Sequence, residues 1–206
     1  MLIKFKNIVL KYGCPKGIIH IGAHLMEERN DYLLFGLKNT IWIEANPKIY
    51  EIIKFINNEN LNERVFNYAI SDTDNIDIKL NVANNGESSS ILQLEKHKIH
   101  HPNIFITEQI LVKTKRMDSL INENNIEIND YDFLNIDIQG AELLALKGFG
   151  KLLNNIKYIY VEINTNTLYK DCALVNEIDE YLEKFKFKRV ETSMTQYEWG
   201  DAFYIK

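Results

Sequence analysis

Two kinds of hydrophobic pattern alternate along most of this chain. Short runs that are apolar throughout predict buried strands, and longer stretches with apolar residues every three or four positions predict helices packed against them. The predicted strands cover residues 18–21, 40–44, 64–70 and 158–163, with a further strand that starts at residue 133, and the predicted helices cover residues 26–37, 47–55, 117–124 and 174–185, with a further helix that starts at residue 143. This alternation predicts an α/β fold with a mostly parallel, doubly wound sheet and helices on both faces.

The region between residues 72 and 116 breaks this alternation. Apolar residues at every second position from Ile76 to Leu80 predict an extra strand, residues 86–90 predict a polar loop, and residues 104–115 predict another extended run. A long insertion in a compact domain is more often a substrate loop or a lid than filler. We therefore expect residues 72–116 to contribute to a substrate site.

The end of the chain contains two further extended segments, residues 188–192 and 198–205. Because they are so close in sequence, they predict an antiparallel, hairpin-like edge of the sheet. No element is predicted for the residues that precede the turn signal at residues 13–17.

Length, charge and composition narrow the classes of function. The 206 residues suffice for one α/β domain, so we expect residues 1–206 to form a single domain. The net charge of -5 argues against nucleic acid as a partner. Short, interrupted apolar runs and a start without signal-peptide features predict a cytoplasmic protein with no membrane association. Cys14 and Cys172 are far apart and predict neither a disulfide nor a zinc site.

Acidic residues follow the strand that starts at residue 133, in the order Asp137-Ile-Gln-Gly-Ala-Glu142. A charge in or beside a buried strand is costly unless it is paired or faces a cleft. In open α/β sheets, ligands bind in the crevice beyond the carboxyl ends of the strands. Asp137, Gln139 and Glu142 are therefore candidates for chemistry rather than for folding.

Two other strand ends carry candidates for binding a nucleotide-like ligand. In the segment His20-Ile-Gly-Ala-His24, Gly22 permits close approach of the backbone to a ligand, although a glycine at such a turn is needed for structure as often as for binding. Glu44 ends the second strand, where a carboxylate can accept hydrogen bonds from both hydroxyls of a ribose. The alternative for Glu44 is a solvated strand-end carboxylate.

These motifs, in this order, resemble the FkbM-like group of class I S-adenosylmethionine-dependent methyltransferases. The resemblance rests on residues 19–24, 42–47, 68–72, 87–90 and 134–148, and it extends to residues 161–163 and 199–204. It therefore covers nearly the whole chain. Its specific part is residues 137–142, because the family pattern there is Asp, a hydrophobic residue, Glu, Gly, Ala or another small residue, and Glu.

The resemblance implies a Rossmann-like, seven-stranded, mostly parallel sheet with an antiparallel last strand. It also implies that S-adenosylmethionine lies over the carboxyl ends of the first three strands, with Glu44 at the ribose, Ala69 at the adenine, and Asp137 facing both the cofactor and the acceptor. By this mapping, the cofactor-binding residues are His20, Gly22, Ala23, His24, Glu44, Ala45, Ala69 and Asp137. The chain departs from the family pattern where His20 replaces an acidic residue and Gln139 replaces Glu.

The chemistry of methyl transfer indicates which side chains are candidates for catalysis. Transfer from a sulfonium mainly requires alignment of the reactants and exclusion of water, and a hydroxyl acceptor must also lose its proton. Asp137 is the first candidate for positioning the acceptor or taking its proton, and Glu142, Glu162 and His24 follow. Glu142 could instead complement a helix dipole, and Glu162 could be half of a buried pair with a lysine. A divalent metal on Asp137, Glu162 and Asn164 is a less favoured alternative, and no metal is predicted.

Polar and aromatic residues elsewhere leave their roles open. Hydroxyl groups at residues 88–90 suit a sugar-like acceptor, and His97, His100 and His101 could contact it or form an exposed turn. Trp199 could stack on an acceptor ring, although packing of the last strand is favoured.

The sequence thus predicts an S-adenosylmethionine-dependent methyltransferase, and more specifically O-methylation of a hydroxyl on a carbohydrate or small-molecule acceptor. One alternative is a binding module that keeps the nucleotide cleft but catalyses nothing, motivated by His20 and Gln139. Another is a nicotinamide-dependent oxidoreductase, which lacks support from a multi-glycine fingerprint. A homodimer is retained as an alternative state of assembly.

Overall fold

The computed structural model describes residues 1–56 and 61–206. The elements, in chain order, are α1 (Phe5–Tyr12), β1 (Ile18–Ile21), α2 (Arg29–Leu34), β2 (Thr40–Ile43), α3 (Pro47–Ile56), β3 (Glu63–Phe66), β4 (Ala69–Ile70), β5 (Asp77–Ala83), α4 (His97–His100), β6 (Ile106–Lys115), α5 (Met117–Glu123), the 3-10 helix η2 (Ile128–Asp130), β7 (Phe133–Ile136), α6 (Glu142–Phe149), the 3-10 helix η3 (Gly150–Asn154), β8 (Tyr158–Asn164), α7 (Val175–Glu183), β9 (Lys188–Met194) and β10 (Trp199–Ile205).

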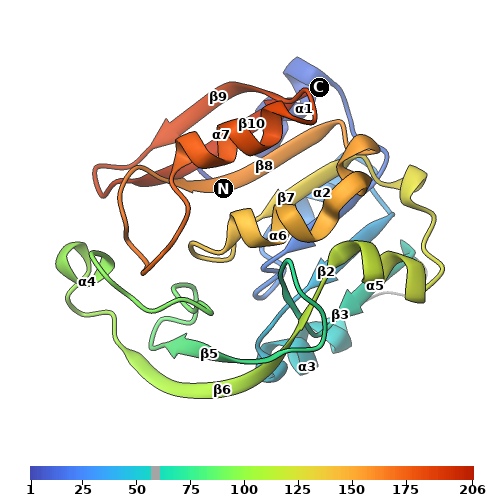
Figure 1. The fold of residues 1–206 in the computed structure, drawn as a ribbon. Helices are drawn as coiled ribbons and strands as arrows, with labels where there is room; N and C mark the ends of the chain where they lie inside the picture. The colour runs from blue at the N-terminus through green and yellow to red at the C-terminus, as the bar shows by residue number, and fades with distance from the viewer. Residues whose placement is uncertain (57–60) are drawn as a thin grey trace.

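Seven of these strands form one sheet in the order β3-β2-β1-β7-β8-β10-β9 (Figure 1). β10 is antiparallel to both of its neighbours, and the remaining adjacent pairs are parallel. This arrangement confirms the predicted fold class, including the antiparallel last strand. The strand order reverses direction beside β1, because β2 and β7 flank it, and such a point is where open α/β sheets form their ligand crevice.

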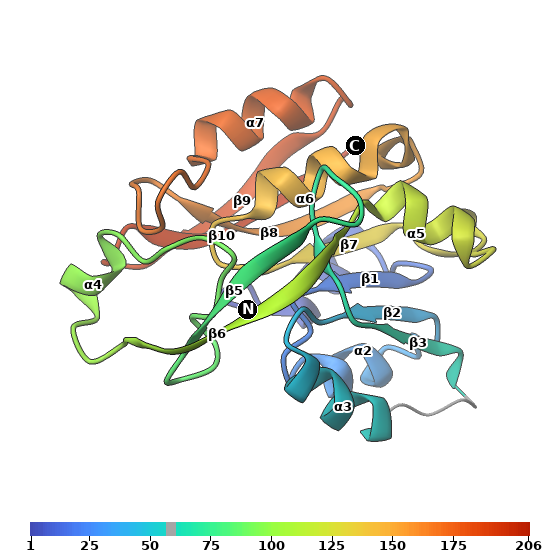
Figure 2. The same ribbon diagram turned by 60° about the horizontal axis from the view of Figure 1, so that its bottom comes forward.

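Helices cover both faces of the sheet (Figure 2). Successive side chains of a strand point to opposite faces, so each strand contributes to two cores. Ile19 and Ile21 pack in a core with side chains from α5, α6 and α7, whereas Ile18 packs in a second core with side chains from α1, α2 and α3. Burial on both faces explains why the central strands are apolar throughout. Within the described residues, none of the helices has the length and apolar character needed to cross a bilayer.

Residues 72–116 contain β5, α4 and β6, and β5 and β6 form a long ribbon in front of the main sheet (Figure 2). β5 is antiparallel to β6, and β6 pairs in parallel with the short β4. These three strands form a separate sheet in the order β4-β6-β5. The two predicted extended runs of this region are therefore confirmed, while α4 between them was not predicted.

Three local predictions differ from the structure. The first predicted helix starts only at Arg29, because His24 and Met26 adopt left-handed backbone angles, with φ of 40° and 60°, that a right-handed helix does not contain. The predicted strand at 64–70 is split into β3 and β4, where Asn67 donates a 2.7 Å hydrogen bond to the carbonyl of Glu44. In addition, the N-terminal residues form α1, which was not predicted.

Candidate functional site

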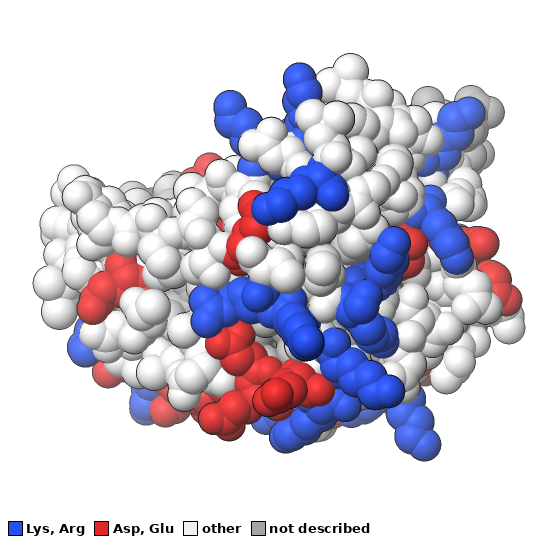
Figure 3. Space-filling view, turned by 90° about the horizontal axis from the view of Figure 1, so that it is seen from above, with Lys and Arg blue, Asp and Glu red and all other residues white. Residues whose placement is uncertain are grey.

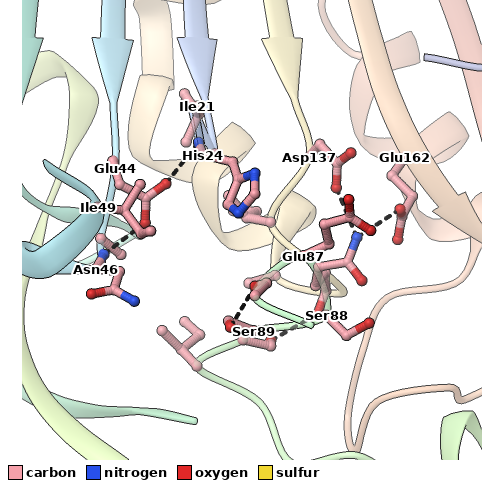
Figure 4. A pocket seen from close by; sticks show the side chains of 18 of the residues that line it. Ile21, His24, Glu44, Asn46, Ile49, Glu87, Ser88, Ser89, Asp137 and Glu162 are labelled. Carbon is pink, nitrogen blue, oxygen red and sulfur yellow. Dashed lines mark hydrogen bonds between the residues drawn. The ribbon is translucent and has the colours of Figure 1, made fainter. Parts of the chain in front are cut away.

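A cavity of about 570 Å³ opens where β1, β2, β7 and β8 end. Ligand sites for small molecules and cofactors usually measure about 300–1,000 Å³. Figure 4 shows Glu44 and Asn46 on one side of the cavity and Asp137 and Glu162 on the other, with His24 between them. The strand ends singled out in the sequence therefore meet in one place.

The turn after β1 explains Gly22. This residue has a φ of 87°, and its N–H donates a 2.9 Å hydrogen bond to the carbonyl of Ile43. A Cβ atom at this position would lie 1.8 Å from the backbone oxygen of Asp137. Glycine is thus required by the crossing of two backbone segments, whether or not a ligand approaches. Ala23, the next residue, is buried in the core and does not line the cavity.

Glu44 is held in position by two backbone groups. One carboxylate oxygen accepts a 2.9 Å hydrogen bond from the N–H of His24, and the other accepts a 2.7 Å bond from the N–H of Asn46. Burial raises the pKa of Glu44, and these hydrogen bonds oppose that effect. Because each carboxylate oxygen has more than one lone pair, Glu44 can still accept bonds from a ligand. Ala45 and Ala69 line the cavity on the same side.

His20 and His24 differ in environment although both line the cavity. His20 is buried, its ring stacks on Trp42 with centroids 4.9 Å apart, and its Nδ1 lies 3.1 Å from the hydroxyl of Tyr32. Burial lowers the pKa of His20, which favours the neutral imidazole. The Nδ1 atom of His24 lies 2.7 Å from a carboxylate oxygen of Glu27.

Gln139 joins Asp137 to Glu162 at the opposite side of the cavity. Its Nε2 donates 2.8 Å hydrogen bonds to a carboxylate oxygen of each. Its Oε1 accepts a 2.5 Å bond from the hydroxyl of Tyr169, and its backbone oxygen accepts a 2.7 Å bond from the hydroxyl of Ser90. The backbone of Gln139 is left-handed, with a φ of 57°, which is uncommon for a residue with a side chain. We infer that these contacts hold Gln139 in this conformation.

The grouping of acidic residues changes their protonation. Burial raises the pKa of Asp137 to about 6, although the hydrogen bond from Gln139 opposes this shift. Burial also raises the pKa of Glu162 well above its ordinary value, and the charges of Asp137, Glu142 and Asp201 add to that effect. Near neutral pH, Asp137 is therefore the better proton acceptor of the pair.

Glu142 does not line the cavity. It is fully buried, and its Oε1 accepts hydrogen bonds from the N–H groups of Ile138 at 3.2 Å and Gly140 at 2.9 Å. Burial raises its pKa to about 7. These contacts place Glu142 beneath the loop that carries Gln139, where it supports the loop from inside the protein.

Asp201 and Tyr160 also line the cavity, and neither was predicted from the sequence. The hydroxyl of Tyr160 donates a short hydrogen bond to Asp201, and both residues line the cavity beside Glu162. Tyr160 and Glu162 lie on β8, and Asp201 lies on the adjacent strand β10, where it pairs with Glu162. The signal in the sequence was a charged residue inside an apolar strand, the same signal that selected Asp137.

The set Asp137, Glu162 and Asn164 is not assembled as a metal site. Asn164 is fully buried and does not line the cavity, and its side-chain amide has no hydrogen-bond partner within residues 1–56 and 61–206. In the same residues, no cluster of three or more His, Cys, Asp or Glu side chains has the arrangement of a metal site.

Comparisons with solved structures identify the fold. Sp1610 of Streptococcus pneumoniae, a candidate tRNA (m1A22) methyltransferase, is 11% identical, and the match covers 97% of this chain and 68% of that one with a TM-score of 0.52. An uncharacterized protein from Listeria monocytogenes serotype 4b is 10% identical over 98% of this chain and 67% of that one, also with a TM-score of 0.52. The fold is therefore that of the class I methyltransferases.

The family follows from the sequence match. Residues 20–189 match the model of the methyltransferase FkbM domain, and the chain belongs to that family. It is 29% identical over 132 residues to the 2-O-methyltransferase NoeI of Sinorhizobium fredii (strain NBRC 101917 / NGR234), a match that covers 60% of this chain. The chain spans about half the length of that relative, 52%.

Proposed function

We propose that this protein is an S-adenosylmethionine-dependent O-methyltransferase that acts on a hydroxyl group of a carbohydrate or small-molecule acceptor. The observation that carries the proposal is the placement of Glu44 and Asp137 on opposite sides of one cavity. Membership of the FkbM family supports methyl transfer, and the 2-O-methyltransferase relative supports oxygen as the acceptor atom.

The residues of the cavity suit S-adenosylmethionine. Glu44 offers oriented carboxylate oxygens to a ribose, and Ala45, Ile49 and Ala69 offer apolar surface beside it. Asp137 offers negative charge to a cofactor that carries a sulfonium and an ammonium group. These residues would hold the nucleoside at one side of the cavity and the reactive end near Asp137.

When bound, the cofactor supplies a methyl group whose transfer breaks a carbon–sulfur bond and forms a carbon–oxygen bond. The protein has to align the acceptor hydroxyl and exclude water. We assign the acceptor proton to the Asp137 carboxylate, which Gln139 orients through its amide N–H. Because the pKa of Asp137 is about 6, the group is ionised and able to accept a proton above that pH.

Calorimetry with S-adenosylmethionine and its demethylated product tests the cofactor site. Loss of a charged hydrogen-bond acceptor should weaken binding by Glu44→Ala by about 10- to 100-fold. Glu44→Gln keeps an acceptor for one backbone N–H and should therefore disturb the fold less than Glu44→Ala does. Thermal melting checks that both variants fold. Glu180→Ala, on an exposed face of α7, is the matched control. Failure of the wild-type protein to bind either compound would refute the proposal.

The pH dependence of turnover tests Asp137. With an acceptor in hand, kcat should rise as the pH increases through about 6, because Asp137 must lose its proton before it can accept one. Asp137→Asn should abolish that rise and lower kcat by about 100-fold or more. Cofactor binding without transfer to any acceptor would instead favour a catalytically silent binding module.

A further inference from the structure

One wall of the cavity is built from three segments that are distant in sequence. His97 and His101 belong to α4 and the residue after it, Tyr169 follows β8, and Trp199 starts β10, and all four residues line the cavity. We call these four residues the aromatic wall. The centroids of the His97 ring and the Tyr169 ring are 5.5 Å apart, and those of His97 and His101 are 4.8 Å apart.

Backbone and side-chain contacts hold the aromatic wall together. The N–H of His97 donates a 3.1 Å hydrogen bond to the carbonyl of Leu168, and Leu94 forms a β-bridge with Tyr169. Within the wall, Tyr169 forms a small hydrophobic cluster with Leu94, Leu168 and Cys172, and Trp199 packs against this cluster. Residues 72–116 thus attach to the segment after β8 and contribute to the lining of the cavity.

The aromatic wall has the surface chemistry of a sugar site. Aromatic faces offer apolar area to a sugar ring, and ring nitrogens and hydroxyl groups offer hydrogen bonds to its hydroxyls. Nδ1 of His97 is buried and has no hydrogen-bond partner within the described residues, so a hydroxyl near it could supply one. Burial lowers the pKa of His97 to about 4, with the neighbouring His101 and His100 adding to the effect, so the imidazole is neutral at physiological pH.

Negative charge lies beside this wall. Asp137, which is ionised at pH 7, lines the cavity at the end of β7, and Glu87 approaches from the loop below it (Figure 4). The carboxyl groups of Glu162 and Asp201 line the cavity from neighbouring strands, and burial raises the pKa of both. By contrast, the outer face in Figure 3 carries many lysine and arginine side chains among acidic ones. An acceptor with a phosphate or carboxylate would place like charges close together, which disfavours binding.

We propose that the aromatic wall is the acceptor subsite, and that it binds an uncharged sugar while the adjacent carboxylates reject sugars that carry phosphate or carboxylate groups. This inference rests on the proposed methyl transfer and names the charge class of its acceptor. It assigns Trp199, whose ring is half-buried, to the face of the sugar ring and His97 to its hydroxyls, while the fully buried Tyr169 supports the wall.

The experiment compares matched pairs of acceptors. Each pair consists of the methyl glycoside of a neutral sugar and the 1-phosphate of the same sugar, both incubated with S-adenosylmethionine and the wild-type protein. Transfer is followed by mass spectrometry as the gain of one methyl group. We expect kcat/KM to be at least about 10-fold higher for the neutral member. Glu87→Lys should narrow that ratio severalfold, since Glu87 is exposed and its replacement brings a positive charge to the cavity.

Variants of the wall separate acceptor binding from cofactor binding. Trp199→Ala should lower kcat/KM for the glycoside by about 10-fold, and Trp199→Phe should restore most of it, because an aromatic face is retained. Neither variant should change the Kd of the demethylated cofactor. His100→Gln is the control, because His100 contacts Glu198 at 3.0 Å and does not line the cavity.

Three outcomes would overturn the inference. The first is preference for the phosphorylated member of a pair, and the second is an equal loss of cofactor and acceptor affinity in Trp199→Ala. The third is cofactor binding by calorimetry with neither transfer to any neutral glycoside nor binding of one by saturation-transfer NMR. That last result leaves the cofactor half of the proposed function standing, whereas absence of cofactor binding refutes the proposed function itself.

Discussion

At the scale of single residues, Gln139 shows what a departure from the family pattern means in this chain. One amide nitrogen donates to both Asp137 and Glu162, so the side chain serves two carboxylates at once. Ionised carboxylates only accept hydrogen bonds, which fixes the amide orientation and leaves its oxygen for the hydroxyl of Tyr169. A glutamate at this position would lack the donor unless it were protonated.

Gln139→Glu tests this role. The variant removes the amide donor and adds a third carboxyl group, so the pKa of Asp137 should rise further. We expect the pH profile of kcat to move about one unit toward alkaline pH and kcat at pH 7 to fall about twofold, because the ionised fraction of Asp137 falls from roughly nine-tenths to roughly one-half. Gln93→Glu, at an exposed position outside the cavity, should leave the profile in place. An unchanged profile for Gln139→Glu would show that the amide does not position Asp137.

Glu142 gives a prediction about stability. Its pKa is raised from the ordinary value to about 7, so the folded state favours the protonated form. This contribution to the free energy of unfolding is fully present below about pH 4.5 and is lost as the pH rises through 7. Relative to Glu142→Gln, which imitates the protonated acid, the wild-type protein should therefore lose on the order of 1–3 kcal/mol between pH 5 and pH 8.

Urea denaturation of both proteins across this pH range measures the difference. Glu180→Gln, on the exposed side of α7, provides a control in which no trend is expected. A constant difference between wild type and Glu142→Gln would mean that Glu142 stays ionised in the folded protein.

The sequence was informative about which residues gather and less so about what each one does. Glu44 and Asp137 could be predicted because they end strands whose apolar pattern is unambiguous. The buried position of Glu142 depends on the path of the loop before α6, which no local pattern specifies. Asp201 was missed because its partner, Glu162, lies on a strand that is adjacent only after folding.

At the scale of elements, the connection after β1 fixes how the ends of β1 and β7 meet at the cavity. The Gly22 backbone crosses that of Asp137 so closely that the ends of β1 and β7 behave as one unit. The helix after this turn was predicted too early because an apolar period does not report the left-handed residues His24 and Met26. The split of the third strand likewise depends on pairing of β4 with β6, a contact between distant segments.

A pair of glycine variants tests the crossing. Gly22 and Gly36 both have positive φ, of 87° and 76°, but a Cβ atom on Gly36 would meet nothing within 4 Å. Gly36→Ala should lower the free energy of unfolding only by the cost of left-handed backbone angles for a residue with a side chain, about 1–2 kcal/mol. Gly22→Ala should cost at least about 2 kcal/mol more, because the methyl group overlaps the Asp137 carbonyl. Thermal and urea unfolding measure both, and equal losses would argue against a close crossing in solution.

At the scale of the whole molecule, two large hydrophobic cores stabilise the sheet and its helices. A much smaller cluster attaches residues 72–116 to the segment after β8 and holds the aromatic wall together. The general plan was predictable, since alternation of strands and helices reports a doubly wound sheet. The attachment of residues 72–116 could not be predicted from the sequence, because the contacts of Leu94 with Tyr169 join segments far apart in the chain.

Amide hydrogen exchange should show that the region held by the small cluster is less stable than the strands buried between the two large cores. We expect amides of residues 84–105 to exchange at least about 10-fold faster than those of β7, because few buried contacts oppose local opening. Leu94→Ala should increase exchange in residues 84–105 and leave β7 unchanged. Equal protection of both regions would show instead that the wall opens only when the whole domain unfolds.

The strand order also bears on how the protein is made. β1 pairs with β2 and β7, and β7 leaves the ribosome more than a hundred residues after β1. Until then, one edge of β1 has no partner strand, and the apolar side chains of the first three strands remain partly uncovered. Pairing across such a distance slows folding and exposes hydrophobic surface to other chains. We therefore expect nascent chains that stop before β7 to aggregate or to bind chaperones, and chains that include β8 to be released as compact domains.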